Sequence, residues 1–245
     1  LSINCCKCLS FMTAVQDGST TTRNYQFYYT GSKEAYRNGQ IPYGQTTFQR
    51  DVRWSNFNYL TYKYKKKSHS LEATLGQETS GRSSESLLGQ ATDFPFDNLG
   101  NNNLGLGATP SKVSSSYSDK LLVSFFARIN YSYKNRYLFT ATAREDGSTV
   151  FSANHKWGFF PSFSAAWKMS DEPWMKGQNV ISTMKWRAGW GMVGNDRITN
   201  YLSLDLYSQS KWGVGQTVET VLNPKQLANS DLKWEASQST NIGLD

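Results

Sequence analysis

The sequence predicts an all-β protein, built as an antiparallel up-and-down meander. Three observations support this: apolar and polar side chains alternate along most of the 245 residues, short and long connections separate the alternating segments, and aromatic residues make up 14% of the chain. Successive side chains of a strand point to opposite faces, so alternation indicates strands with one apolar and one polar face. Short turns at one end and long loops at the other are typical of outer-membrane barrels, which carry aromatic girdles at both membrane interfaces.

The alternation places the expected strands. In residues 121–133, for example, Phe125 and Ile129 alternate with Ser124 and Arg128. Strands are expected at residues 52–64, 69–79, 121–133, 136–145, 157–168, 184–193 and 232–245, with a weaker candidate at 23–30. Residues 1–50 are otherwise hard to assign, so the chain divides into that segment and a partial barrel domain at 51–245.

The connections predict which ends of the strands lie together. Turns at 65–68 and 134–135 should share one end of the sheet, and loops at 80–118, 145–156 and 195–230 should share the other, extracellular end. The connection at 169–182 is longer than a turn. Its D-E-P-W sequence could begin a brief helix with Pro173 in an early position.

A soluble, secreted β-sandwich that binds carbohydrate is the alternative, because its strands alternate as well. A membrane barrel differs in carrying aromatic rings near both ends of its strands. In a barrel, the apolar set faces lipid and the polar set faces the lumen. The side chains expected to face lipid are Trp186, Ala188, Trp190, Phe163, Trp167, Phe125 and Phe139, and those expected to face the lumen are Lys185, Arg187, Arg128 and Arg144.

The stretch GWGMVG at 189–194 spells the G-x-G-x-x-G of a dinucleotide-binding turn. That turn needs a buried parallel strand before it and a helix after it. Here the surrounding residues alternate, with Trp186 and Trp190 on one face and Lys185 and Arg187 on the other, and no helical period follows. We therefore interpret the motif as part of a barrel strand, whose glycines leave room in the lumen.

Composition excludes several other classes. No apolar run approaches the length of a transmembrane helix, and the basic residues behind the net charge of +7 are dispersed, so nucleic acid is not an expected partner. Cys5, Cys6 and Cys8 all lie in the first eight residues, and the two histidines are isolated, so we expect no metal site and no cofactor. The N-terminus also lacks the features of a signal peptide.

Four blocks extend this interpretation to a family. They read YSYKNRYLFTATAREDGSTVF, WGFFPSFSAAWKMSDEPWM, MKWRAGWGMVGN and NSDLKWEASQSTNIGLD, and HSLEATLGQE at 69–78 fits an upstream strand more loosely. In this order they resemble the SusC/RagA family of TonB-dependent outer-membrane transporters, over about half of the chain.

The resemblance implies a barrel of about 22 strands in the bacterial outer membrane, with an N-terminal plug. It also implies import of large nutrients, either oligosaccharides or peptides, under a SusD-like surface lipoprotein and with energy from TonB. No plug or TonB-contacting segment is visible in the sequence. We therefore expect an internal fragment of a transporter, embedded in outer-membrane lipid.

The sequence gives no reason to expect an enzyme or a catalytic residue. It contains neither H-E-x-x-H nor G-x-S-x-G, and the neighbouring acids at 145–146 and 171–172 are interpreted as solvated turn residues. Three loop aromatics, Tyr201, Tyr207 and Trp212, could instead stack on sugar rings. Packing within the loop is the alternative for these three.

Overall fold

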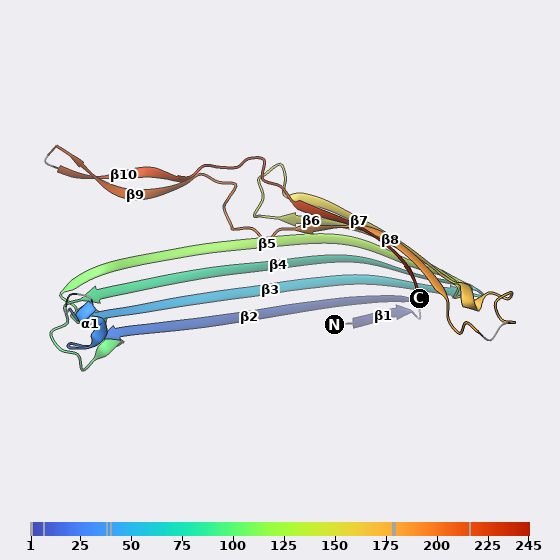
Figure 1. Cartoon of the computed structure of the whole chain (residues 1–245), viewed down its shortest axis with the longest axis horizontal. Coiled ribbons are helices and arrows are strands. Elements are labelled where there is room, and N and C mark those ends of the chain that lie inside the picture. The colour runs from blue at the N-terminus through green and yellow to red at the C-terminus, as the bar shows by residue number, and fades with distance from the viewer. Residues whose placement is uncertain (1, 7, 38, 40, 178–179, 216) are drawn as a thin grey trace. The chain divides into compact units, whose positions relative to one another are not determined.

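The computed structural model describes residues 2–6, 8–37, 39, 41–177, 180–215 and 217–245. Nine strands form one open sheet in the order β1-β2-β3-β4-β5-β6-β7-β8-β11, and β9 and β10 pair only with each other (Figure 1). The predicted antiparallel meander is confirmed, and the sheet does not close into a complete barrel. Within these residues no second sheet covers the first as in a sandwich, so the alternative fold was wrong. No helix of the described chain is long and apolar enough to cross a membrane.

The strands differ in length. The strands are β1 Ser2–Cys6, β2 Leu9–Tyr28, β3 Tyr43–Lys66, β4 His69–Thr92, β5 Thr109–Tyr133, β6 Tyr137–Ser148, β7 Trp157–Lys168, β8 Lys185–Asn195, β9 Leu206–Val214, β10 Thr217–Gln226 and β11 Glu235–Leu244. Short helical segments connect some of them: α1 Lys33–Arg37, η1 Gly100–Leu106 and η2 Met169–Asp171.

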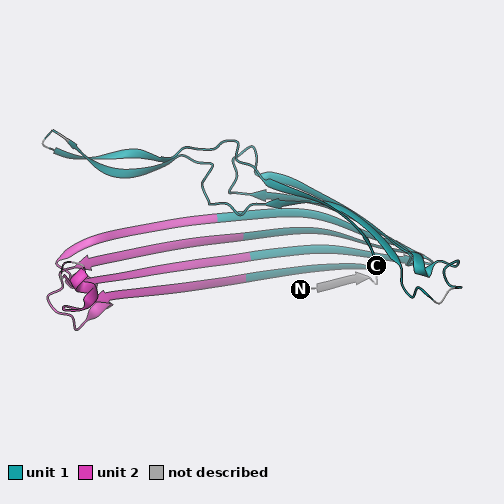
Figure 2. Ribbon diagram, in the orientation of Figure 1, with its two compact units in different colours: residues 1–16, 55–80, 120–245 teal, residues 17–54, 81–119 magenta. Residues whose placement is uncertain are grey.

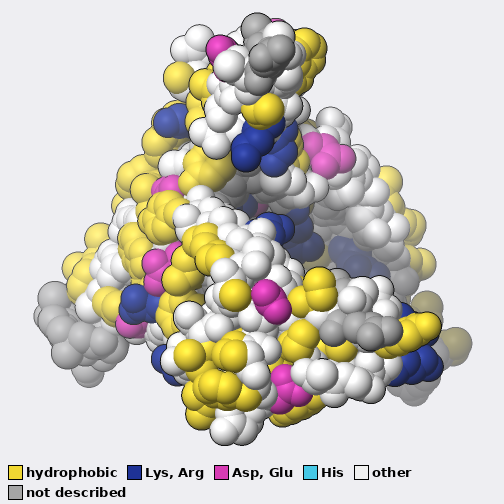
Figure 3. Space-filling view, turned by 90° about the vertical axis from the view of Figure 1, so that its left-hand side faces the viewer, with side chains coloured by type: hydrophobic (Ala, Val, Ile, Leu, Met, Phe, Trp, Pro, Cys, Tyr) yellow, Lys and Arg dark blue, Asp and Glu magenta, His cyan; other side chains and the backbone are white. Residues whose placement is uncertain are grey.

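The chain forms two compact units (Figure 2). Unit 1 comprises residues 1–16, 55–80 and 120–245, and unit 2 comprises residues 17–54 and 81–119. In unit 2, Ala35, Ala91 and Phe94 are buried, and the Phe94 ring meets the Phe27 ring edge-on at 5.1 Å. In the view of Figure 3, acidic and basic side chains are scattered among hydrophobic ones.

Two tight turns of unit 1 lie side by side. Lys67, Lys134 and Asn135 adopt positive φ angles, as short hairpin turns require, and the Lys134 amide donates to the Ser68 carbonyl over 2.7 Å. The expectation that these two turns share one end of the sheet is therefore confirmed. We call it the turn end. Because β6 starts there and ends at Ser148, the loop that follows lies at the opposite end.

At that opposite end of unit 1 the loops pack into a small core. Val150 and Phe151 are 2% exposed and Phe160 is 7% exposed. The Trp234 ring, just before β11, lies 4.9 Å from the Phe151 ring and 5.3 Å from the Phe160 ring. These contacts thereby fix the start of β7 against the residues that lead into β11.

Several sequence-based expectations about the connections were wrong. Residues 80–118 were expected to be one loop, but β4 continues to Thr92 and β5 starts at Thr109, so only 93–108 connect them. The excursion at 195–230 contains the β9–β10 hairpin. No helix begins at D-E-P-W, because the 3₁₀ turn η2 ends at Asp171, before Pro173. The segment 1–50, hard to assign from sequence, holds β1, β2, α1 and the start of β3.

Candidate functional site

The strand register brings the expected lipid-facing residues onto one face of the sheet. Trp167 lies opposite Trp186, Ala165 opposite Ala188, and Phe163 opposite Trp190. Phe139 lies opposite Ala165 on the other side of β7, and Phe125 occupies the same face of β5 by alternation. We call this the apolar face.

Several large side chains of the apolar face are about half exposed. Phe163 is 56% exposed, Phe139 50%, Phe125 49% and Trp186 44%. Large contiguous apolar surfaces of this kind mark contact with a membrane or another protein. Flat stacking between neighbouring strands, as between Phe163 and Trp190 at 6.1 Å, keeps the rings close to the sheet.

At the turn end the apolar face finishes in a row of aromatic rings. Tyr133 stacks on Tyr137 at 6.2 Å, and Tyr137 stacks on Trp167 at 6.4 Å. The Lys134 ammonium lies 5.2 Å from the Tyr133 ring centre, and His69 Nδ1 is hydrogen-bonded to the Tyr131 hydroxyl. Amphipathic rings beside a cation suit the boundary between hydrocarbon and headgroups.

Away from the turns, the apolar face becomes polar. Asn58 lies two residues before the exposed Leu60 on β3, and Gln77 lies two residues after the exposed Leu75 on β4, so both share that face. Thr13 Oγ1 donates to Asn58 Oδ1, and Asn58 Nδ2 donates to Gln77 Oε1, both over 2.8 Å. These hydrogen-bonded polar side chains cross β2, β3 and β4 and mark where the apolar part of this face ends.

The opposite face carries a charged network centred on Arg144. Its Nε donates to Asp146 Oδ1 over 2.7 Å, and one Nη donates to Glu78 and to the Ser124 hydroxyl, each over 2.9 Å. The Tyr59 hydroxyl donates to the second Glu78 oxygen over 2.7 Å. We call this the polar face. Satisfied charges at half-buried positions fit a wall that water wets on one side only.

The other expected lumen-facing cations also lie on the polar face. Arg128 Nε donates to the Thr142 hydroxyl over 3.3 Å, and Arg187 pairs with Asp245 over 3.2 Å. Lys185 lies opposite Lys168. That this face borders a lumen stays a prediction, as does the lipid contact of the apolar face.

The three aromatics considered for ligand stacking are not brought together. Tyr201 precedes the β9–β10 hairpin and has a φ of +67°. Tyr207 and Trp212 are 62% and 63% exposed on β9, and their odd spacing of five puts them on opposite faces of the hairpin.

Sequence reasoning missed a carboxylate site at the turn end. Glu172 accepts hydrogen bonds from Tyr137 Oη at 2.7 Å and Trp167 Nε1 at 3.1 Å, and pairs with Arg136 at 3.0 Å. These hydrogen bonds, the one from Tyr137 first, lower the pKa of Glu172 below its ordinary value of 4.5. Asp146 and Glu172 are buried, so the interpretation of the acids at 145–146 and 171–172 as solvated turn residues was wrong for these two. Glu145 is exposed.

The glycines of the GWGMVG stretch occupy β8, and no helix follows. A Cβ at Gly194 would lie 2.1 Å from the Phe160 ring, whereas one at Gly189 would make ordinary contacts at 3.6 Å. Gly194 is therefore needed for packing against the small loop core. The motif belongs to an antiparallel strand, so a dinucleotide-binding turn is excluded.

The described residues hold no cluster of His, Cys, Asp and Glu that could bind a metal ion. The side chains of Cys5 and Cys6 lie outside the described residues, and Cys8 is half-buried.

One apolar face with an aromatic row, one charged face, and an open antiparallel meander are together the features of a segment of a β-barrel wall. Residues 10–245 match the family described as "TonB dependent receptor-like, beta-barrel", and the chain belongs to that family. It is a SusC/RagA-type member and covers only part of such a barrel.

Relatives of the chain carry matching names. It is 37% identical over 204 residues to TonB-dependent receptor P3 of Formosa agariphila, covering 82% of this chain and 20% of the relative. It is 43% identical over 129 residues to TonB-dependent receptor SusC of Bacteroides thetaiotaomicron, covering 51% of this chain and 13% of the relative.

Solved structures support the fold. The RagAB peptide transporter superposes with a TM-score of 0.90 at 23% identity, over 99% of this chain and 27% of that one. The chain thus spans about a quarter of this structure and a fifth or less of the two curated relatives.

Proposed function

We propose that this chain forms part of the barrel wall of a bacterial outer-membrane transporter that imports large nutrients, oligosaccharides or peptides. The observation that carries the proposal is the two-faced sheet. Trp186 and Trp190 share a face with Phe163, while Arg144, Glu78 and Asp146 form ion pairs on the other face. A wall between lipid and a water-filled lumen needs this separation.

Lipid contact and lumen contact follow from that separation. The seven residues expected to face lipid all lie on the apolar face, and Lys185, Arg187, Arg128 and Arg144 line the lumen in this proposal. An arginine or lysine at the midplane of a barrel's lipid face costs about 2–4 kcal/mol, which disfavours the reverse assignment.

The partners in this proposal are inferred from related proteins of the family. Related chains are named TonB-dependent receptors, and one solved relative is a peptide transporter. We infer that the full-length protein holds a plug that TonB pulls, and that a SusD-like lipoprotein closes over its loops. Tyr201, Tyr207 and Trp212 are candidate contacts for the nutrient or for that lid.

Fractionation of cells that express the full-length protein containing this sequence tests the proposal. We expect the protein in the outer membrane, resistant to a salt wash, extracted only by detergent, and shifted on a gel by heating. A SusD-like lipoprotein should co-purify in mild detergent. Release by salt, with no heat-dependent shift, would contradict a membrane barrel.

A further inference from the structure

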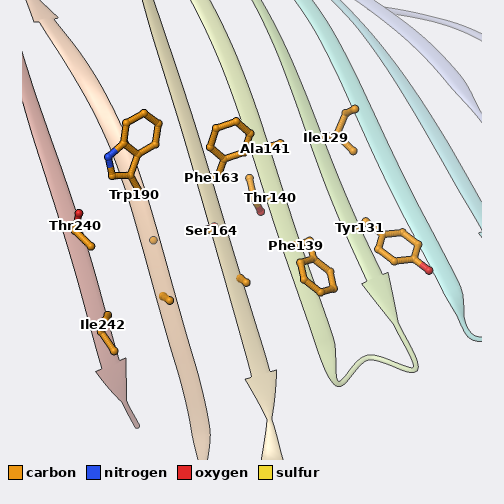
Figure 4. A pocket seen from close by; sticks show the side chains of 13 residues that line it. Ile129, Tyr131, Phe139, Thr140, Ala141, Phe163, Ser164, Trp190, Thr240 and Ile242 are labelled. Atoms are coloured by element: carbon orange, nitrogen blue, oxygen red, sulfur yellow. The ribbon is translucent and has the colours of Figure 1, made fainter.

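The apolar face contains a groove with a floor of small side chains. Ala165 and Ala188 lie opposite each other, and Ala141 is the neighbouring small residue on β6. Phe163 and Trp190 form the wall on one side of the alanine pair (Figure 4). Trp167 and Trp186 form the wall on the other side.

Two adjoining hollows make up this groove. One of about 500 Å³ reaches from Ile129 on β5 to Thr240 on β11, and one of about 280 Å³ continues toward Tyr137 and Trp186 at the turn end. The two hollows share Phe139, Ala165, Ala188 and Ile242. The groove is therefore continuous from the middle of the apolar face to the aromatic row at the turn end.

The turn end offers uncompensated positive charge. Segments 65–67, 134–136 and 168–176 hold seven lysines and arginines against two carboxylates, Asp171 and Glu172. Glu172 is neutralised by Arg136. No ion pair among the described residues includes Lys134, whose ammonium lies over the Tyr133 ring at the end of the aromatic row. An anionic headgroup here would gain charge-assisted hydrogen bonds from this ammonium.

We propose that the groove holds an acyl chain of an anionic glycerophospholipid, with the phosphate beside Lys134 at the turn end. This inference rests on the proposed function, because it requires the apolar face to contact lipid. The alanine floor leaves room for methylene groups, which the flanking rings contact from both sides, so the apolar surface of the acyl chain is buried. The lysine selects a negatively charged headgroup over a zwitterionic one.

Native mass spectrometry of the purified full-length protein with added phosphatidylglycerol or phosphatidylcholine tests this. Wild type should retain phosphatidylglycerol preferentially. Ala165→Phe fills the floor and displaces about two methylenes, so it should weaken phosphatidylglycerol binding roughly tenfold. The control Ala127→Phe adds the same ring on the apolar face outside the groove and should bind as wild type does. Lys134→Ala should abolish the preference between the two lipids.

Each variant is first checked for the heat-dependent gel shift, and Ala165→Leu replaces Ala165→Phe if the larger side chain impairs assembly. If assembled wild type and the Ala165 variant bound phosphatidylglycerol equally, lipid binding in the groove would be wrong, but the proposed barrel would not be affected. A wild-type preference for lipid A would also overturn it. So would a wild-type dimer that dissociates in Ala165→Phe, since a second copy would then occupy the groove.

Discussion

The face on which each β8 side chain lies decides which face of the sheet can contact lipid. Arg187 lies over Gly243, where a Cβ would come within 2.8 Å of its Nε, and its pair with Asp245 is half-exposed. An exposed ion pair of this kind is worth at most about 1 kcal/mol, so we expect the loss of Arg187 to cost little stability. Its neighbour Ala188 occupies the floor of the apolar groove, where a charge has no partner.

Substitutions at Ala188 and Arg187 should have opposite effects on assembly of the barrel. In the full-length protein, Ala188→Arg should sharply lower the heat-modifiable fraction in the outer membrane, because it puts a cation in hydrocarbon at a cost of about 2–4 kcal/mol. Arg187→Ala should leave that fraction nearly unchanged. If Arg187→Ala were the damaging change, the facing of β8 would be reversed.

Gly194 gives a second residue-level prediction. Gly194→Ala should destabilise the barrel by about 1–3 kcal/mol, because the new methyl meets the Phe160 ring, which Trp234 holds in place. The temperature at which the gel band loses its heat resistance should fall. Gly213→Ala, which has open space around its Cβ, is the matched control and should not change it. Adding Phe160→Leu to Gly194→Ala should restore much of the loss.

Among the elements, the strands with one apolar and one polar face were predictable from sequence, and their polar extensions were not. Residues 121–133 and 157–168 alternate between apolar and polar side chains, and their strands were expected. Residues 81–92 of β4 and 109–119 of β5 read GRSSESLLGQAT and TPSKVSSSYSD, which carry polar side chains on both faces. Without an apolar face there is no period of two, so the sequence resembles a loop.

The polar sites were only half predictable for a related reason. The alternation placed Arg144 on the face opposite Phe139, but its partner Glu78 is 66 residues away in the chain. Glu172 likewise meets Arg136 and Tyr137 from distances of 36 and 35 residues. Only the pairing of strands creates such contacts, so no local pattern reveals them.

The Glu172 site links η2 to the hairpin of β5 and β6, and its stabilisation should depend on pH. Because the pKa of Glu172 is lowered in the folded state, the ionised carboxylate stabilises the fold fully above its ordinary value of 4.5. This stabilisation is lost as the pH falls through the lowered folded-state pKa. Glu172→Gln should therefore melt below wild type at neutral pH.

The difference in melting temperature should shrink as the pH falls well below 4.5, which melting of the detergent-purified full-length protein can follow. Asp171→Asn is the matched control, since no ion pair of the described residues includes Asp171. It should melt as wild type does at neutral pH. A gap between wild type and Glu172→Gln that stays constant across the acid range would contradict the role of the carboxylate.

For the molecule as a whole, the open sheet requires further strands. Its outermost strands are β1 and β11, and an unpaired strand edge in hydrocarbon leaves backbone groups without hydrogen bonds, at several kcal/mol each. The family match implies that a complete barrel supplies those strands. Short turns of such barrels face the periplasm and long loops face the outside. The turn end and the connection at 93–108 should therefore lie on different sides of the membrane.

Thiol labelling on intact cells tests that orientation. In a full-length protein with Cys5, Cys6 and Cys8 replaced by serine, Asn102→Cys in the exposed η1 should react with an impermeant maleimide. Ser68→Cys, in the β3–β4 turn, should react only after the outer membrane is opened, because the reagent cannot reach the periplasm. Labelling of Ser68→Cys on intact cells, with Asn102→Cys protected, would invert the topology and place the groove's positively charged end in the outer leaflet.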